Sequence, residues 1–113
     1  MIPFIKSWGG ETMNPDEELR RFLHLVKTKN IDLIPRTENL EMHRYFGITR
    51  YDQIEFIRSV DCSDYYKGPL EDDGPGRTGL VWVFKKYYED KEIYIKLKYK
   101  SDKDEITAIS CHL

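Results

Sequence analysis

Hydrophobic and polar residues alternate strictly along residues 92–100 of the chain. Successive side chains of a β-strand point to opposite faces of the sheet, so this alternation predicts a strand with two different faces. The face that we expect in the core is formed by Ile93, Ile95, Leu97 and Tyr99. The other face is formed by Tyr94, Lys96, Lys98 and Lys100. Three ammonium groups beside a phenol suit the phosphates and bases of single-stranded nucleic acid.

Two more β-type runs flank this strand, residues 80–84 before it and residues 105–112 after it. Short polar turns at residues 89–91 and 101–104 join the three runs, which predicts an antiparallel β-meander. Residues 68–76 are rich in glycine, proline and acidic side chains, so we expect a loop there.

Helical spacing dominates the first half of the chain. Asn14 and Pro15 are typical of a helix start, as the cap and the first helical residue. The apolar residues that then recur at helical spacing are Leu19, Phe22, Leu23 and Val26. A second helix is expected over residues 38–46, with Thr37 as its cap and Gly47 as its end.

A third helix is predicted to begin directly after the second. Thr49 is expected to cap it and Asp52 to bond back to the cap. The residues expected to face inward are Tyr51, Ile54, Ile57 and Val60. The whole pattern predicts an α+β fold, with N-terminal helices packed on one face of a small C-terminal antiparallel sheet. A chain of 113 residues suffices for one domain with one core, and residues 1–12 are expected to form a loosely held arm.

The net charge of −2 conceals an uneven distribution. Residues 1–76 carry 10 Lys and Arg against 14 Asp and Glu, whereas residues 77–113 carry 8 against 6. The excess of positive charge therefore lies in the third of the chain that contains the Tyr/Lys strand.

Cys62 and Cys111 lie far apart and show no metal-ligand spacing, which indicates neither a zinc site nor a disulfide framework. We expect no metal and no other cofactor. No apolar run is long enough to span a bilayer, and the N-terminus does not resemble a signal peptide. These features favour a reduced, cytoplasmic protein that does not engage membranes.

Candidate chemistry gathers on the last strand. Alternation places Thr107 with Cys111 on one face, and Ser110 with His112 on the other. If the more apolar set enters the core, His112 joins Tyr94 and Lys96 on the open face. Cys111 and His112 then point apart and cannot act as a nucleophile and base pair. An imidazole side chain is suited to proton transfer, which makes His112 a candidate general acid or base.

Simpler interpretations exist for these residues. Tyr94 could serve only sheet packing, and the lysines could merely protect a sheet from aggregation. His24 and His43, on predicted helices, are expected to be solvated surface residues. Lys67 would add a cation at the rim, in the turn between helices and loop. Residues 71–74 lack the ligand pattern of a calcium loop and are predicted to form a solvated turn.

Four short motifs occur in a fixed order: residues 64–69 (Asp-Tyr-Tyr-Lys-Gly-Pro), 81–84 (Val-Trp-Val-Phe), 93–98 (Ile-Tyr-Ile-Lys-Leu-Lys) and 109–112 (Ile-Ser-Cys-His). Together they resemble the MqsR (motility quorum-sensing regulator) family of bacterial type II toxins. The resemblance covers the second half of the chain in motif detail and the helical half in layout. It implies the small α+β fold of the RelE-like toxins.

The resemblance also implies a function, that of a metal-independent endoribonuclease that cleaves mRNA and is held inactive by a cognate antitoxin. We expect this antitoxin to be a small helix-turn-helix protein. The catalytic residues implied are Lys67, Tyr94, Lys96 and His112. Further RNA contacts are assigned to Lys98, Lys100 and Trp82. Two positions depart from the family pattern, since His112 replaces a C-terminal lysine and Val83 falls roughly where a glutamine stands.

Two other functions remain open from the sequence. A module on the same fold could bind RNA or a protein through the basic face without cleaving RNA. A protein-interaction domain could instead accept a strand from a partner at an exposed sheet edge.

Overall fold

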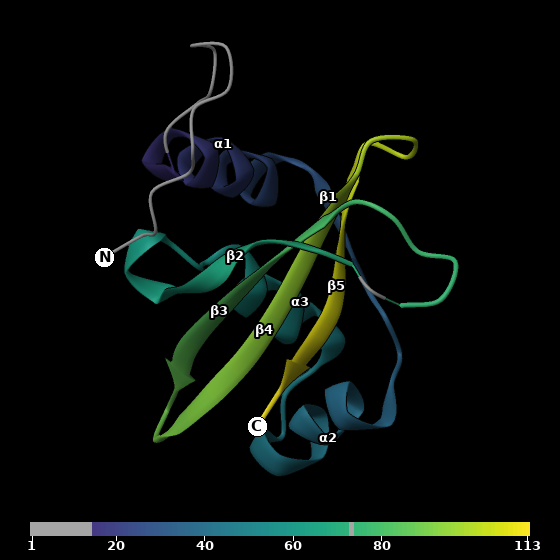
Figure 1. Cartoon of the computed structure of the whole chain (residues 1–113). Helices are drawn as coiled ribbons and strands as arrows, with labels where there is room; N and C mark the ends of the chain where they lie inside the picture. The colour runs from purple at the N-terminus through teal and green to yellow at the C-terminus, as the bar shows by residue number, and fades with distance from the viewer. Residues whose placement is uncertain (1–14, 73) are drawn as a thin grey trace, which may run out of the picture.

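The computed structural model describes residues 15–72 and 74–113, and in these residues the chain has an α+β fold (Figure 1). The helices are α1 (Pro15–Thr28), α2 (Thr37–Phe46) and α3 (Arg50–Arg58), followed by a short 3-10 turn, Cys62–Asp64. The strands are β1 (Asn30–Leu33), β2 (Tyr65–Glu71), β3 (Leu80–Tyr88), β4 (Lys91–Lys100) and β5 (Glu105–His112). None of these helices is long and apolar enough to cross a membrane.

The strands form one mixed sheet in the order β1-β5-β4-β3-β2. The antiparallel meander predicted from the three β-type runs is confirmed as β3, β4 and β5. The prediction was incomplete, because β1 pairs in parallel with β5 and β2 pairs antiparallel with β3. β1 is only four residues long, and its two apolar side chains, Ile31 and Leu33, are both buried.

The prediction of a loop over residues 68–76 was wrong for residues 68–71, which belong to β2. Pro69 has no N–H to donate, but β2 is an edge strand and tolerates this loss. A Cβ on Gly68 would lie 3.0 Å from the Cα of Trp82, so glycine allows β2 to approach β3 closely. Lys67 accordingly lies on a strand, not in a turn.

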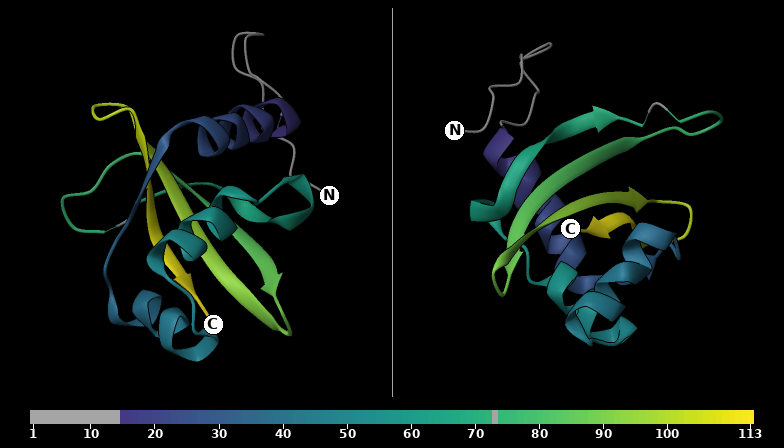
Figure 2. Two further views of the ribbon diagram at one scale, coloured as in Figure 1. Left: turned by 180° about the vertical axis from the view of Figure 1, so that it is seen from behind. Right: turned by 90° about the horizontal axis from the view of Figure 1, so that it is seen from below.

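The helices cover one face of the sheet and share a single hydrophobic core with it. Seen from behind, α3 lies in front of the strands (Figure 2, left). The apolar residues predicted for the inner side of α1 are buried, and Phe22 stacks on Trp82 with 5.2 Å between ring centroids. On the same face, β4 contributes Ile93, Ile95 and Leu97, as the alternation predicted. Tyr99 is only partly buried and packs at the margin of this core.

The helix boundaries confirm part of the capping prediction. Thr49 and Asp52 form the predicted capping box of α3. Gly47 ends α2 with a φ of 66°, a left-handed conformation that favours glycine. Thr37 does not cap α2, because the helix already includes it and Arg36 occupies the N-cap without a side-chain cap bond.

The buried side of α3 differs from the prediction. Tyr51 is 69% exposed, so its predicted inward orientation was wrong, and Ile54 is only partly buried. Gln53 and Phe56 are buried instead, together with Ile57. The predicted cap Asn14 and the predicted arm at residues 1–12 lie outside the described residues.

A β-bulge interrupts the pairing of β5 with β4. Lys96 pairs with Ser110 and Leu97 pairs with Ala108, so Ile109 is an additional residue on β5. The alternation of faces along β5 therefore changes at this point.

The bulge corrects the predicted faces of β5. Thr107 pairs with Lys98 and shares its face, whereas it was predicted to lie with Cys111. Beyond the bulge the prediction is confirmed, since Cys111 is fully buried in the core and His112 pairs with Tyr94 on the opposite face.

Candidate functional site

The face of the sheet that the helices leave uncovered brings Tyr94 and His112 together. They are cross-strand partners, and their rings stack with 5.4 Å between centroids and 27° between planes. Lys85 is the partner of Tyr94 on its other side. All three side chains are partly exposed. An aromatic ring beside a titratable imidazole is thus accessible from solvent.

The neighbouring row on the same face brings two of the predicted lysines close together. Lys67 pairs with Val83, Val83 pairs with Lys96, and Lys96 pairs with Ser110. The backbones of Lys67 and Lys96 are therefore two strand spacings apart, roughly 10 Å. Two lysine side chains can converge on one phosphate across such a span. We call Lys67, Lys85, Tyr94, Lys96 and His112 the Tyr94 cluster.

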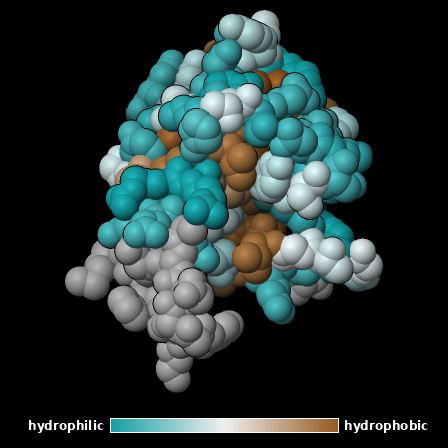
Figure 3. Space-filling view, turned by 90° about the horizontal axis from the view of Figure 1, so that it is seen from above, coloured by the Kyte–Doolittle hydropathy of each residue, from teal (hydrophilic) through white to brown (hydrophobic). Residues whose placement is uncertain are grey.

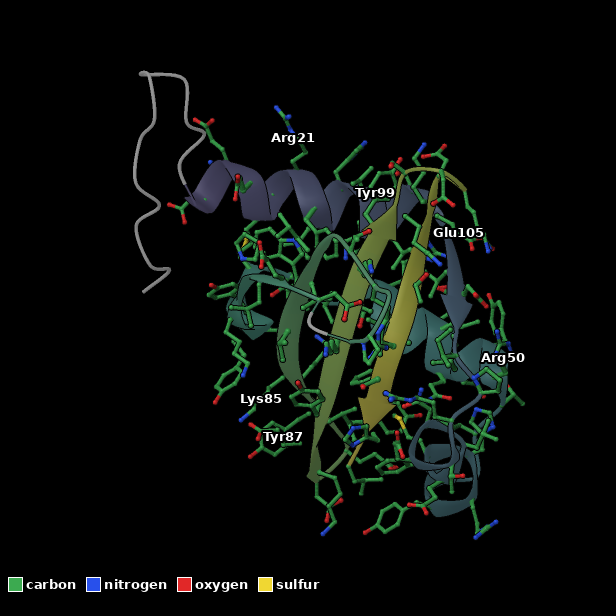
Figure 4. The ribbon with its side chains drawn as sticks, turned by 45° about the vertical axis from the view of Figure 1, so that its right-hand side comes forward. Arg21, Arg50, Lys85, Tyr87, Tyr99 and Glu105 are labelled. Atoms are coloured by element: carbon green, nitrogen blue, oxygen red, sulfur yellow. The ribbon has the colours of Figure 1, made fainter. Side chains whose placement is uncertain are left out.

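Lys85 was missed by the sequence analysis. Its ammonium lies 3.9 Å from the ring centroid of Tyr66, and that of Lys67 lies 5.6 Å from the same ring. Figure 4 shows Lys85 near one end of β3, with Tyr99 and Glu105 near the opposite end of the sheet. The alternation of β3 was the available signal, because Lys85 follows Val81 and Val83 on one face.

The Tyr94 cluster has uncompensated positive charge. Within residues 15–72 and 74–113, none of Lys67, Lys85 and Lys96 takes part in an ion pair. Three ammonium groups in one patch attract a polyanion, and the stacked rings of Tyr94 and His112 suit an unpaired base.

Two buried amides hold the end of β5, and the sequence analysis missed both. Asn39 of α2 accepts a hydrogen bond from the Cys111 N–H at 2.9 Å and donates to the Ile109 carbonyl at 3.0 Å. Gln53 of α3 donates to the Cys111 carbonyl at 3.1 Å. Because these bonds lie on both sides of Ser110 and next to His112, the helices set the position of the histidine.

His112 is oriented further by its neighbour Leu113. Its Nδ1 lies 2.9 Å from the carbonyl oxygen of Leu113. A proton on Nδ1 would complete this hydrogen bond and leave Nε2 for proton exchange with a ligand. Cys111 offers no comparable chemistry, because burial raises the pKa of its thiol to about 12. The other histidines differ from each other, since His24 is exposed, as predicted, and His43 is partly buried.

Lys98, two residues beyond Lys96, lies in a different environment. It is 9% exposed, and its ammonium donates to the Asp72 carboxylate at 2.9 Å. This bond holds the pKa of Asp72 below its usual value. The prediction of a solvated turn at residues 71–74 was therefore wrong for Asp72, which is 7% exposed. Lys98 does not offer a free ammonium to RNA, and Lys100 is partly buried beside it.

Trp82 lies on the other face of the sheet. It is 6% exposed and lines a hollow of about 330 Å³ with Phe22, Leu25 and Leu80. Viewed from the α1 end, the surface shows hydrophobic side chains between hydrophilic ones (Figure 3). The structure therefore separates Trp82 from the Tyr94 cluster, although the sequence analysis assigned both to RNA.

The function of this site has to be inferred from its geometry, because in comparisons with known proteins no family model matches the chain and no similar curated protein was found. In the described part of the chain, no group of three or more His, Cys, Asp and Glu side chains could hold a metal ion. The arrangement that remains is a patch of lysines with a stacked tyrosine and histidine on an open sheet face.

Proposed function

We propose that this protein is an endoribonuclease that cleaves single-stranded mRNA, acting as the toxin of a type II toxin–antitoxin system. The observation that supports this function is the stacking of Tyr94 on His112 beside three lysines that form no ion pair with any described residue. The resemblance of the four sequence motifs to the MqsR family points to the same activity.

The chemistry proposed is attack of an RNA 2′-hydroxyl oxygen on the adjacent phosphorus. The new P–O bond forms as the bond to the 5′-oxygen breaks, which leaves a 2′,3′-cyclic phosphate and a 5′-hydroxyl. The proton of the 2′-hydroxyl passes to solvent water, and the protonated imidazole of His112 gives its Nε2 proton to the leaving 5′-oxygen. Lys67 and Lys96 neutralise the charge that develops on the phosphate oxygens. Tyr94 stacks on a base and orients the scissile linkage. No metal or other cofactor takes part.

The proposed partner is a cognate antitoxin, a small DNA-binding helix-turn-helix protein. An anionic or strand-forming segment of such a protein would suit the basic open face or the edge strand β2. The proposed site of action is the cytoplasm, where mRNA is translated.

A second function, RNA binding without cleavage, is favoured by one observation. Val83 lies between Lys67 and Lys96 in the central row and is 1% exposed. It offers the phosphate no hydrogen-bond donor at the middle of the Tyr94 cluster. This alternative predicts salt-sensitive RNA binding with no cleavage products.

A cleavage assay with matched substrates distinguishes the two functions. N-terminally tagged protein, in which the tag does not adjoin His112, is incubated with a long unstructured RNA in excess EDTA, and new 5′ ends are mapped. Ribonuclease activity predicts discrete cuts that disappear when the nucleotide before each cut carries a 2′-O-methyl group. Salt-sensitive binding to an RNA that stays intact would contradict cleavage and support the binding module.

A further inference from the structure

A polar hollow opens on the same sheet face as the Tyr94 cluster, at the end covered by the β2–β3 loop. Its volume is about 220 Å³. It is lined by Ile34, Arg36, Asp72, Arg77, Lys98, Lys100, Thr107 and Ile109. Four of these side chains are cationic and one is anionic. None of them belongs to the catalytic residues proposed above.

Thr107 gives this hollow an unsatisfied hydrogen-bonding group. The residue is 7% exposed, and its buried Oγ1 has no hydrogen-bond partner among residues 15–72 and 74–113. Leaving a buried hydroxyl without a partner costs free energy, so such groups are normally bonded to protein, water or ligand. A hydroxyl in a cationic hollow is suited to donate to an anionic oxygen.

The ion pairs around the hollow leave positive charge for a ligand. Asp72 is shared between Lys98 at 2.9 Å and Arg77 at 3.5 Å. Arg36 forms an ion pair with Glu38 at 3.5 Å, and Glu38 does not line the hollow. Lys100 forms no ion pair with any residue of the described ranges. Two carboxylates thus face four cations, an excess that a phosphate diester or monoester would neutralise.

The hollow lies next to the Tyr94 cluster. An Nη1 atom of Arg36 lies 3.4 Å from both the Ser110 hydroxyl and the Ile109 carbonyl, at the bulge of β5. Ser110 is the cross-strand partner of Lys96. Lys98 follows Lys96 on the same side of β4 at a distance of roughly 7 Å along the strand. A ligand that extends along β4 would reach both places.

We propose that this hollow is a phosphate subsite, in which Arg36, Arg77, Lys100 and Thr107 hold an internal phosphodiester of the RNA that flanks the scissile linkage. This proposal rests on the proposed function, because it assigns the hollow to the same RNA strand. Its position next to the stacked rings of Tyr94 and His112 favours RNA over an acidic protein segment. The phosphate subsite sets the register of the RNA on β4, whereas the Tyr94 cluster carries out the cleavage.

Binding of an uncleavable strand tests the subsite separately from catalysis. The probe is a fluorescent 2′-O-methyl oligonucleotide without terminal phosphates, which cannot react through its 2′-oxygens, and affinity is measured over a range of salt concentrations. Lys100→Gln should weaken binding roughly fivefold to tenfold and reduce the salt slope by about 0.7, the value for one phosphate contact to a single strand. Thr107→Val should weaken binding several-fold without changing the salt slope.

Lys103→Gln provides the matched control, because Lys103 is an exposed lysine in the β4–β5 turn that does not line the hollow. Thermal unfolding verifies that each variant is folded. The proposal would be overturned if Lys100→Gln and Thr107→Val bound like the wild type, or if Lys103→Gln weakened binding equally. Two further results would also overturn it. The first is that the wild type binds only a probe that carries a 5′-phosphate, and the second is that the variants lose affinity for an acidic peptide but not for the oligonucleotide. A wild-type protein that binds this probe yet cuts no RNA would instead contradict the proposed ribonuclease.

Discussion

Lys96 and Lys98 lie two residues apart on β4 and point to the same side of the sheet, yet their surroundings are opposite. Lys96 is partly exposed and forms no ion pair with the described residues, whereas Lys98 is 9% exposed and bonded to Asp72. The difference arises from the β2–β3 loop, which closes over one end of the sheet face through the Asp72 N–H bond to the Gly79 carbonyl. Alternation in a strand therefore predicts the side of a lysine but not whether its charge is available to a ligand.

The largest effect is expected on the helix-covered face, at Trp82. Replacing this buried indole with alanine leaves a cavity against Phe22 and should lower the free energy of unfolding by about 4 kcal/mol. Denaturant unfolding measures this change. A variant that keeps wild-type stability but loses RNA binding would show that Trp82 contacts RNA, as the sequence analysis predicted.

A slightly smaller effect is expected where the loop buries a charge. Asp72→Asn leaves the Lys98 ammonium buried without its carboxylate and should cost about 3 kcal/mol of unfolding free energy. The double variant Asp72→Asn with Lys98→Met removes both charges and should recover much of this loss. Equal stabilities of the single variant and the wild type would mean that Lys98 is as available as Lys96.

Lys96→Gln should show the reverse pattern. With no ion pair to lose among the described residues, the variant should unfold within about 0.5 kcal/mol of the wild type. Its RNA cleavage should fall about a hundredfold, since one stabiliser of the phosphorane charge is removed. Single-turnover rates and denaturant unfolding of the same preparation test both parts. Lys91→Gln, at an exposed lysine that begins β4, is the control that should change neither.

The smallest effect on the free energy of unfolding is expected when the pH is lowered. Because the pKa of Asp72 is lowered in the folded protein, its carboxylate adds stability above the unfolded value of about 4. That contribution disappears as the pH falls from there through the lowered folded value. The difference in unfolding free energy between wild type and Asp72→Asn should therefore shrink below pH ~4. Asp52, Asp61 and Asp104 also have lowered pKa values, so only this difference isolates Asp72.

The sequence predicted those parts of the fold in which one local pattern decides the outcome. The alternation of β4, the capping box at Thr49 and Asp52 and the helix end at Gly47 each depend on nearby residues alone. β2 was missed because Gly68 and Pro69 normally break strands, and only the edge position of β2 makes them acceptable. The predicted inward orientation of Tyr51 was wrong, because Gln53 is buried instead and donates hydrogen bonds to the carbonyls of Asn39 and Cys111.

The candidate site likewise contains some residues that a local pattern predicts and others that it does not. Tyr94, Lys96 and His112 follow from alternation on adjacent strands, and they lie together as predicted. The bulge at Ile109 was not predictable from β5 alone, because it depends on pairing with β4 and on the bond from Asn39. Arg36, Arg77 and Asp72 reach the open face from a helix N-cap and a loop, positions that no local pattern relates to β4. Long-range packing supplies this information.

The most direct test of the proposed activity compares two histidines. His112→Ala and His24→Ala each remove one imidazole, but only His112 belongs to the Tyr94 cluster, while His24 is exposed on α1. Single-turnover cleavage of unstructured RNA in EDTA should fall about a hundredfold or more in His112→Ala and remain at the wild-type rate in His24→Ala. Equal cleavage by His112→Ala, His24→Ala and the wild type would contradict the account.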